Sequence, residues 1–374
     1  MKNLTLLIKP ASSKCNLSCK YCFYTDVANS RRDFEYDSMT ENTMKKLIDN
    51  AFNSVDSDGQ ITFAFQGGEP MLAGIEFFYS FIENVNKIKS SVKVYYSLQT
   101  NGLLIDDSWC DLFKDNNFLI GLSIDGNMLF HDANRVDKNH YGTFERVINA
   151  KQLLDKNKIE YNVLTVLTKE LSMNPNSYFA FLKQYRIKYS QIIPCLEHLD
   201  GSKHGAEVNP ILFFNFYKEL LKIWIEYLKH GEYYSIKLFD DIVNFILHGR
   251  IGFCGMNGFC NNQKVVESNG DIFPCDFYCI DKYRMGNIEN LNINDTNYSR
   301  QYIDFSTPEK LSSICLTCNL LYICNGGCKR LKNRMYLDID ENFCGFREIF
   351  NVIYRNIDII SNYLDDIFFD ANNQ

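Results

Sequence analysis

Short apolar runs alternate with amphipathic segments over the first 200 residues, and this pattern constrains the fold more than any other feature of the chain. The amphipathic segments have helical spacing, and Ser38 and Glu41 can open one of them, residues 40–52, as a capping box. Strict alternation of strand and helix predicts parallel βα units. Six units predict a partial (β/α)6 TIM-like barrel, since a closed barrel needs eight. The six expected strands are residues 4–10, 60–66, 93–100, 118–125, 161–168 and 190–198.

The character of the chain changes after about residue 235, where cysteines become dense. Residues 264–275, KVVESNGDIFPC, predict a hairpin, because Asn269-Gly270 supplies the positive φ angles of a two-residue turn. Helical patterns cover residues 210–230 and 347–369. We therefore predict an α/β protein with a barrel domain, 1–234, and a cysteine-rich C-terminal domain, 235–374, that holds a β-hairpin and helices.

Composition restricts the partners and the compartment. The 374 residues are 46% hydrophobic and carry a net charge of −7, which argues against a nucleic-acid partner. No apolar stretch reaches the roughly 20 residues of a membrane span, and the N-terminal run is too short for a signal peptide. We expect a cytoplasmic protein with no membrane partner. Its fourteen cysteines would then stay reduced and would favour metal binding over disulfides.

Three cysteines, Cys15, Cys19 and Cys22, follow the first expected strand in the pattern CxxxCxxC. They can hold three corners of a four-iron cluster and leave one iron open for a chelating cofactor or substrate. A zinc site is the alternative, but it would need a fourth cysteine or histidine close in sequence, and there is none.

Eight further cysteines in the second half can fill two four-cysteine sites. From spacing alone, two iron–sulfur clusters and two structural zinc sites are nearly equal interpretations. The remaining cysteines are Cys110 on an amphipathic helix and Cys195 in a strand, both expected as small buried hydrophobes, and Cys279, which could compete as a ligand. The eight are Cys254, Cys260, Cys275, Cys315, Cys318, Cys324, Cys328 and Cys344.

Polar motifs follow the first four strands, so all of them should gather at the carboxyl rim of the barrel. In GGEP, Gly67 and Gly68 allow a close backbone approach, and Glu69 can accept from an ammonium group. Asp276 directly follows Cys275. Its carboxylate is either a general base beside a redox centre or a structural hydrogen-bond acceptor, and the sequence does not choose.

The run CNLSCKYC, followed by an aromatic residue, resembles the signature of the radical S-adenosylmethionine enzymes. The resemblance implies that the cofactor chelates the open iron, with Tyr21 beside the adenine and the GGEP segment holding the methionine amino group. Contacts to ribose and carboxylate would come from Ser123 and Arg135. The full set of implied cofactor contacts is Tyr21, Gly67, Gly68, Glu69, Ser123, Arg135 and Leu196.

The second-half cysteines resemble the SPASM extension of radical enzymes that modify peptides. The resemblance implies one auxiliary cluster on Cys254, Cys260, Cys275 and Cys328 and another on Cys315, Cys318, Cys324 and Cys344. With every position filled by protein, these clusters would serve electron transfer and structural support. Three [4Fe-4S] clusters and S-adenosylmethionine are the expected cofactors.

Motifs along nearly the whole chain, including AFQGGEP, SLQTNG, CGMNGFC and VVESNGDIFPCDFY, resemble the anaerobic sulfatase-maturating enzymes. That family implies oxidation of a cysteine or serine of a sulfatase to Cα-formylglycine without oxygen, with Asp276 as the base. The expected partners are an unfolded or nascent sulfatase and a flavodoxin, ferredoxin or reductase as electron donor, and we expect a monomer. The expected substrate-facing residues are Tyr24, Gln66, Gln99 and Asn101.

Two alternative functions are weighed against this one. A SPASM enzyme that forms a thioether or an epimerised residue in a ribosomal peptide would share all the clusters. Such enzymes often carry an N-terminal recognition domain, for which we expect no room because the first strand starts by residue 4. The other alternative is a zinc-binding protein without catalysis, which would be colourless where an iron–sulfur protein is brown.

Overall fold

The structure, a computed structural model, describes residues 1–34 and 36–372, with side chains described through residue 367. The chain forms two compact units, and each draws on separated segments. The first contains Met1–Ser123, Asn134–Tyr161 and Cys260–Thr307, and the second contains the rest of the described chain. The boundary expected between residues 234 and 235 remains a prediction.

Four parallel strands build the centre of the first unit, and they confirm the first four expected strands. In β1 the side chains of Leu4, Leu6 and Ile8 are buried, as alternation along a half-buried strand requires. Each strand is followed along the chain by one or more helices. The strands are β1 (Asn3–Lys9), β2 (Gln60–Phe65), β3 (Lys93–Thr100) and β4 (Leu119–Ser123).

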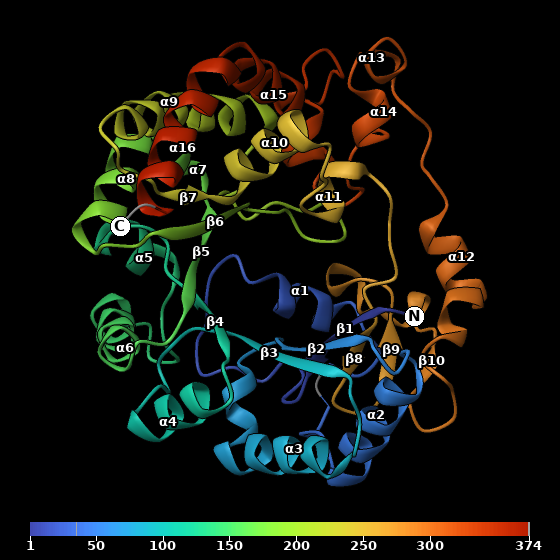
Figure 1. Ribbon diagram of the computed structural model, residues 1–374. Coiled ribbons are helices and arrows are strands. Elements are labelled where there is room, and N and C mark those ends of the chain that lie inside the picture. The colour runs from blue at the N-terminus through green and yellow to red at the C-terminus, as the bar shows by residue number, and fades with distance from the viewer. Residues whose placement is uncertain (35, 373–374) are drawn as a thin grey trace. The chain divides into compact units, whose positions relative to one another are not determined.

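Helices α2, α3 and α4 cover one face of these strands (Figure 1). The core between sheet and helices is aromatic: Phe63 and Phe65 of β2 contact Phe81 of α3 at ring distances of 4.9 and 5.1 Å. The helices of this unit are α1 (Phe23–Asn29), α2 (Glu41–Asn53), η1 (Pro70–Ala73), α3 (Ile75–Lys87), α4 (Asp107–Asp115), α6 (Phe144–Asn157) and α12 (Arg300–Ser306).

The start of α2 corrects one expectation. The capping residue is Thr40, whose side chain accepts from the amide of Thr43, and the helix begins at Glu41. The capping box from Ser38 to Glu41 was therefore wrong. A hydroxyl directly before the first helical residue satisfies an otherwise unpaired amide, and Ser38 lies too far upstream to do so.

The expected hairpin is confirmed as β8 (Val265–Glu267) and β9 (Asp271–Phe273), which pair antiparallel. Its two-residue turn was wrong: three residues, 268–270, connect the strands, and Gly270 has a positive φ of +86° whereas Asn269 does not. β10 (Gly286–Asn287) extends it. β8 also pairs in parallel with β1, so the strand order of this unit is β10-β9-β8-β1-β2-β3-β4. The register places Lys9 opposite Glu267. Three short 3₁₀ turns complete the segment: η2 (Asp276–Tyr278), η3 (Asp281–Tyr283) and η4 (Asp295–Tyr298).

The second unit contains the last two expected strands, β5 (Tyr161–Leu167) and β6 (Tyr189–Pro194), with the short β7 (Ser235–Ile236) beside β6. Its longest helix is α9 (Pro210–Lys229), capped by Asn209, and its buried face contributes Phe213, Phe216 and Trp224. The other helices before residue 258 are α5 (Met128–Asn134), α7 (Lys169–Ser172), α8 (Pro175–Gln184), α10 (Lys237–His248) and α11 (Cys254–Asn257).

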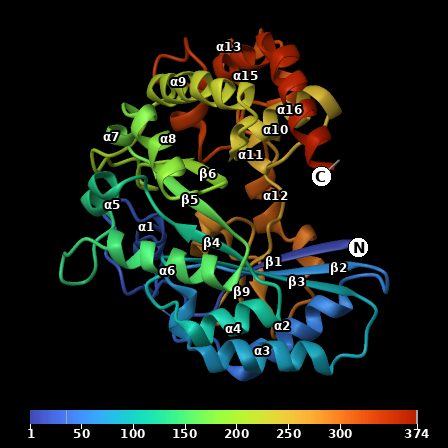
Figure 2. The ribbon, with the colours of Figure 1, turned by 60° about the vertical axis from the view of Figure 1, so that its left-hand side comes forward.

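The C-terminal part of this unit packs α15 (Gly345–Arg355) alongside α9 (Figure 2). It also contains α13 (Ser313–Leu316), α14 (Leu321–Cys324), the π-helical turn η5 (Lys332–Tyr336) and α16 (Ile357–Asn372). The single helix expected over 347–369 was wrong, because the chain breaks at Asn356. There the side-chain amide of Asn356 donates to the carbonyl of Val352. Its backbone amide donates to the carbonyl of Ile353, three residues back, where a continuing α-helix would use the carbonyl four residues back.

Within the described residues, no helix combines the length and apolar character needed to cross a membrane.

Candidate active site and cysteine clusters

The loop between β1 and α1 carries Cys15, Cys19 and Cys22, all partly accessible. The amide of Cys22 donates to the carbonyl of Cys19 at 3.2 Å, which keeps the loop tightly turned, and Cys22 caps α1. Burial raises the pKa of Cys15 to about 11, although the amide of Leu17 donates to its sulfur and opposes that shift. Three free thiols on one short loop are, in number and kind, the thiolate ligands that a site-open four-iron cluster needs.

The GGEP segment packs directly on the chain that leads into Cys15. The amide of Gly68 donates to the Ser12 carbonyl at 2.9 Å, and the amide of Glu69 donates to the Lys14 carbonyl at 2.7 Å. A Cβ at Gly68 would lie 2.2 Å from the Lys14 oxygen. The glycine is therefore required for an approach between two backbones, which holds the cysteine loop in place. Its neighbour Gly67 has a φ of +123°.

Glu69 is fully buried and accepts three hydrogen bonds. The donors are the amide of Met71 at 3.1 Å, the hydroxyl of Thr100 at 2.9 Å and the amide of Asn101 at 2.8 Å. Burial raises the pKa of Glu69 to about 7, and these donors lower it in part. The carboxylate is thus held firmly by three uncharged donors, which fits a site for an ammonium group.

Other rim residues of the first unit are linked in pairs. The side-chain amide of Asn101 donates to Asn16 at 2.8 Å, within the cysteine loop. Gln99 donates to the hydroxyl of Ser123 at 3.0 Å. The guanidinium of Arg135 lies 5.7 Å from the ring centre of Tyr21.

These contacts join Tyr21 with Arg135, Ser123 with Gln99, and Glu69 with Asn101. That the expected residues bind one cofactor together remains a prediction. Leu196 lies two residues after the end of β6 in the second unit, where it is buried.

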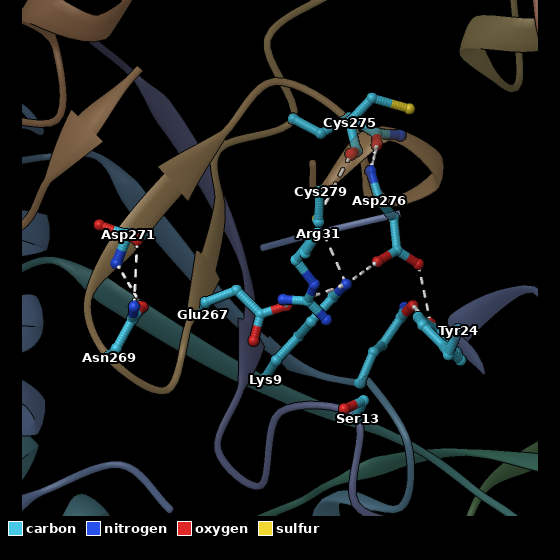
Figure 3. Close-up of polar contacts among 12 residues, drawn as sticks. Lys9, Ser13, Tyr24, Arg31, Glu267, Asn269, Asp271, Cys275, Asp276 and Cys279 are labelled. Atoms are coloured by element: carbon cyan, nitrogen blue, oxygen red, sulfur yellow. Dashed lines mark hydrogen bonds and ion pairs between the residues drawn. The ribbon is translucent and has the colours of Figure 1, made fainter. Parts of the chain in front are cut away.

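Asp276 anchors a polar network at the hairpin end of the first unit (Figure 3). Its Oδ2 accepts from the hydroxyl of Tyr24 at 2.8 Å, and that hydroxyl also lies 3.3 Å from Oε1 of Gln66. Its Oδ1 lies 2.9 Å from Nζ of Lys9. The expected base and two of the expected substrate-facing residues therefore form one connected set.

Sequence reasoning missed three charged members of this network: Lys9, Arg31 and Glu267. Lys9 lies 3.6 Å from Glu267, and Arg31 bonds the same carboxylate at 2.8 Å. All three are buried. One signal was available: Lys9 and Glu267 each end an otherwise apolar run, where a charged side chain needs a buried partner.

Cys279 belongs to this network more than to a metal site. Its side chain is fully buried, Lys9 donates to its sulfur at 3.2 Å, and the thiol donates to the carbonyl of Cys275 at 3.5 Å. Burial raises the pKa of Cys279 to about 12, with Lys9 opposing the shift. Cys110 and Cys195 are both buried, as expected, but Cys195 lies just after β6 and not within it.

The second unit gathers four cysteines around one cavity, the four that the SPASM resemblance assigns to one auxiliary cluster. Tyr336 and Phe346 complete the wall beside them. The cysteines are Cys315, Cys318, Cys324 and Cys344. Four thiols around an enclosed space fit a four-iron cluster in number and kind.

The other implied set divides between the units. Cys254 and Cys328 lie in the second unit, and Cys260 and Cys275 lie in the first. Tyr336 is fully buried and contributes to the wall of the four-cysteine cavity. Its hydroxyl donates to the carbonyl of Gly255, the residue after Cys254, so it also contacts the segment that carries a cysteine of the other set. Burial raises the pKa of Tyr336 well above its usual value, and the thiols of Cys328, Cys324, Cys344 and Cys254 raise it further.

Comparison with known proteins defines the class. Residues 10–175 match the radical SAM superfamily, and residues 254–319 match SPASM, an iron–sulfur cluster-binding domain. The fold and the cysteine loop are those of a radical SAM oxidoreductase with a SPASM domain, whose cofactors are S-adenosylmethionine and [4Fe-4S] clusters.

Similar proteins then specify the family. The chain is 38% identical to a cysteine-type anaerobic sulfatase-maturating enzyme of Clostridium novyi, over 94% of this chain and 95% of that one. A serine-type relative from Bacteroides thetaiotaomicron is 30% identical, with 97% and 91% covered. The solved structure of native anSMEcpe with bound AdoMet and Cp18Cys peptide is 35% identical, with a TM-score of 0.86 and 97% and 99% covered. The chain belongs to the family of anaerobic sulfatase-maturating enzymes.

A more distant structure shows the fold alone. SuiB of Streptococcus suis, solved with the precursor peptide SuiA, is 18% identical with a TM-score of 0.63 and covers 87% of this chain and 72% of its own.

Proposed function

We propose that this chain oxidises a cysteine of a sulfatase polypeptide to Cα-formylglycine without oxygen. The observation that carries the proposal is the Asp276–Tyr24–Gln66 network directly after the implied cluster ligand Cys275. Cysteine is favoured over serine because the cysteine-type relatives are 38% identical to this chain and the serine-type relatives 26 to 30%.

The proposed cofactor site is the loop of Cys15, Cys19 and Cys22 with the rim around it. When bound, the cluster and S-adenosylmethionine supply one-electron chemistry that removes a hydrogen atom from an unactivated carbon. Glu69 would receive the methionine ammonium group, since the three groups that bond its carboxylate are all uncharged. Tyr21, held against Arg135, would face the adenine.

Asp276 is the proposed general base. The substrate β-carbon loses a hydrogen atom and the thiol proton passes to Oδ2 of Asp276, so that a C=S bond forms once one further electron is lost. A cluster held by the auxiliary cysteines would supply the acceptor for that electron. Water then replaces sulfur and releases hydrogen sulfide to give formylglycine. Tyr24 already donates to that oxygen at 2.8 Å and marks where a second donor, the substrate thiol, would bind. Gln99 and Asn101 are the further proposed substrate contacts.

The proposed auxiliary ligands are those named above, with Cys315, Cys318, Cys324 and Cys344 around one cavity. We propose an unfolded or nascent sulfatase as substrate, a flavodoxin, ferredoxin or reductase as electron donor, and a cytoplasmic monomer that binds neither nucleic acid nor membrane.

The test is anaerobic incubation of reconstituted protein with reductant, S-adenosylmethionine and a CxPxR peptide, read by mass spectrometry. We expect one hydrogen sulfide lost and one water gained, together with 5′-deoxyadenosine, and a much lower yield from the matched SxPxR peptide. A crosslinked or epimerised peptide, with no formylglycine, would instead support the ribosomal-peptide alternative.

Two variants separate the steps. Asp276→Asn should lower the ratio of formylglycine to 5′-deoxyadenosine at least tenfold, and Cys15→Ala should abolish 5′-deoxyadenosine formation. Asp58→Asn, the same change at an exposed carboxylate paired with Lys2, is the matched control and should alter neither. Full product yield from Asp276→Asn would remove it from the catalytic residues.

A further inference from the structure

Three buried charged residues beside Asp276 have no part in the proposed function: Lys9, Arg31 and Glu267. Lys9 is the last residue of β1, and its side chain is only 2% exposed. Its ammonium group lies 2.9 Å from Oδ1 of Asp276, 3.6 Å from Oε1 of Glu267 and 3.2 Å from the sulfur of Cys279 (Figure 3). A buried ammonium is costly unless paired, so these contacts need an explanation.

Strand register determines where this ammonium lies. The parallel pairing of β1 with β8 aligns Lys9 with Glu267. Arg31 then bonds the same carboxylate oxygen of Glu267 at 2.8 Å, and neither side chain of that pair is more than 2% exposed. The anchor for Lys9 is therefore built from two strands and one buried ion pair.

The four charges of this network balance. Lys9 and Arg31 supply two cations, and Glu267 and Asp276 supply two carboxylates. Burial lowers the pKa of Lys9, but Asp276, Cys279 and Glu267 together raise it by more than burial lowers it. The net pKa is therefore raised, and the side chain stays an ammonium ion. Loss of any one charge would leave its partner buried and uncompensated.

The geometry divides the two oxygens of Asp276 between two tasks. Oδ1 contacts Lys9, and Oδ2 accepts from Tyr24. The same ammonium lies 5.0 Å from the centre of the Tyr24 ring, so one cation contacts both members of that hydrogen bond. With Oδ1 held by a cation, the carboxylate cannot rotate to exchange its oxygens without breaking a buried ion pair.

We propose that Lys9 is a positioning residue for the base: it fixes Asp276 with Oδ2 turned to Tyr24 and to the substrate thiol, and the Arg31–Glu267 pair fixes Lys9. This inference rests on the proposed function and adds to it a residue that acts through Asp276 and does not touch the substrate. Proton transfer needs a well-aligned acceptor, so loss of alignment should separate hydrogen removal from product formation.

The experiment is a double-mutant cycle on Lys9→Met and Asp276→Asn, with iron content measured for each protein. The readout is the ratio of formylglycine to 5′-deoxyadenosine, together with the KM for the CxPxR peptide. We expect Lys9→Met to lower the ratio at least tenfold with the peptide KM unchanged, and to have no further effect in the Asp276→Asn background. Equal losses from Lys9→Met in both backgrounds would show that Lys9 acts independently of Asp276 and would overturn the proposal.

A second variant guards against a folding failure. Lys9→Met/Glu267→Gln removes one cation and one carboxylate, so the network stays neutral around the remaining Arg31 and Asp276. It should also show the lowered ratio with full iron content, and an unchanged ratio would overturn the proposal. Lys9→Arg, which keeps the charge, should restore part of the ratio that Lys9→Met loses.

The failure of this inference differs from the failure of the proposed function. If wild-type protein makes no formylglycine, the proposed function fails. If wild-type protein makes the product and Lys9→Met leaves the ratio of formylglycine to 5′-deoxyadenosine unchanged, only the role of Lys9 is rejected.

Discussion

The amide of Asn101 donates a 2.8 Å hydrogen bond to Oε2 of Glu69, and this bond ties the loop after β3 to the loop after β2. Thr100 and Met71 bond the other oxygen of the same buried carboxylate. Glu69 is therefore rigid before any cofactor binds. The three groups that bond its carboxylate are uncharged, so a cation would stabilise it further.

The pKa of Glu69, about 7 because of burial, makes cofactor binding depend on pH. An ammonium group binds the ionised carboxylate, so affinity for S-adenosylmethionine should rise between pH 5.5 and 7 and fall by up to about tenfold for each pH unit below 7. Glu69→Gln should weaken binding and remove this dependence. Anaerobic calorimetry at pH 5.5, 6.25 and 7 measures it, and equal wild-type affinity at all three values would contradict the role of Glu69.

Gly68→Ala should disrupt the cysteine loop. The added Cβ would meet the carbonyl oxygens of Lys14 at 2.2 Å and Ser13 at 2.5 Å, which only a backbone shift can relieve. We expect a loss of about 1–3 kcal/mol in stability and a loss of iron from the nearby site.

Gly231→Ala is the control for Gly68→Ala. Its φ is +75°, but nothing lies within 4 Å of the added Cβ, so it tests backbone strain alone. Thermal melting and iron analysis compare the two, and Gly68→Ala with full iron and an unchanged melting temperature would refute the packing argument.

Cys324→Ala should remove one auxiliary cluster. Three four-iron clusters correspond to about 12 irons per chain, so this variant should retain about 8. Cys110→Ala alters a thiol that is also buried but lies on α4, and it should retain all of them. Iron and sulfide analysis of anaerobically reconstituted protein reads the difference, and equal iron in the two variants would remove Cys324 from the ligands.

Tyr336→Phe should destabilise the region between the auxiliary cysteines of the second unit. It removes the hydrogen bond to Gly255 and leaves a buried carbonyl unpaired, at a cost of about 1–3 kcal/mol. Tyr322→Phe, at a tyrosine with 76% of its surface exposed, should cost almost nothing. Melting temperatures of reconstituted proteins compare the two, and a Tyr336→Phe protein as stable as wild type would contradict this account.

Periodicity and the Asn269-Gly270 signal were enough to predict the six strands and the hairpin, because those signals lie within each segment, but they did not predict the hairpin's three-residue turn. The pairing of β8 with β1 could not be predicted in that way, since register between distant strands depends on tertiary packing. The role of Lys9 was missed for the same reason. Thr40 and Asn356 show the local limit: one side-chain hydrogen bond decides where a helix begins or ends.

The resemblance to the SPASM extension grouped Cys315, Cys318, Cys324 and Cys344, which the structure gathers around one cavity. Spacing alone neither divided the eight cysteines into two sets nor chose between iron–sulfur clusters and zinc, because both use thiolates at such spacings. Gly68 was expected to let backbone approach a ligand, and the structure shows it approaching the backbone of Lys14. A sequence reveals that a glycine is needed more readily than it reveals which neighbour needs it.

The contact between Lys9 and Cys279 joins residues 270 positions apart, and this separation bears on synthesis. β1 emerges from the ribosome roughly 260 residues before β8, its neighbour on the other edge. At about 5–20 residues per second, that edge stays unpaired for tens of seconds. A nascent chain of this protein should therefore be prone to aggregation in the interval between the synthesis of β1 and that of β8, and a fragment that stops before β8 should not be a stable barrel.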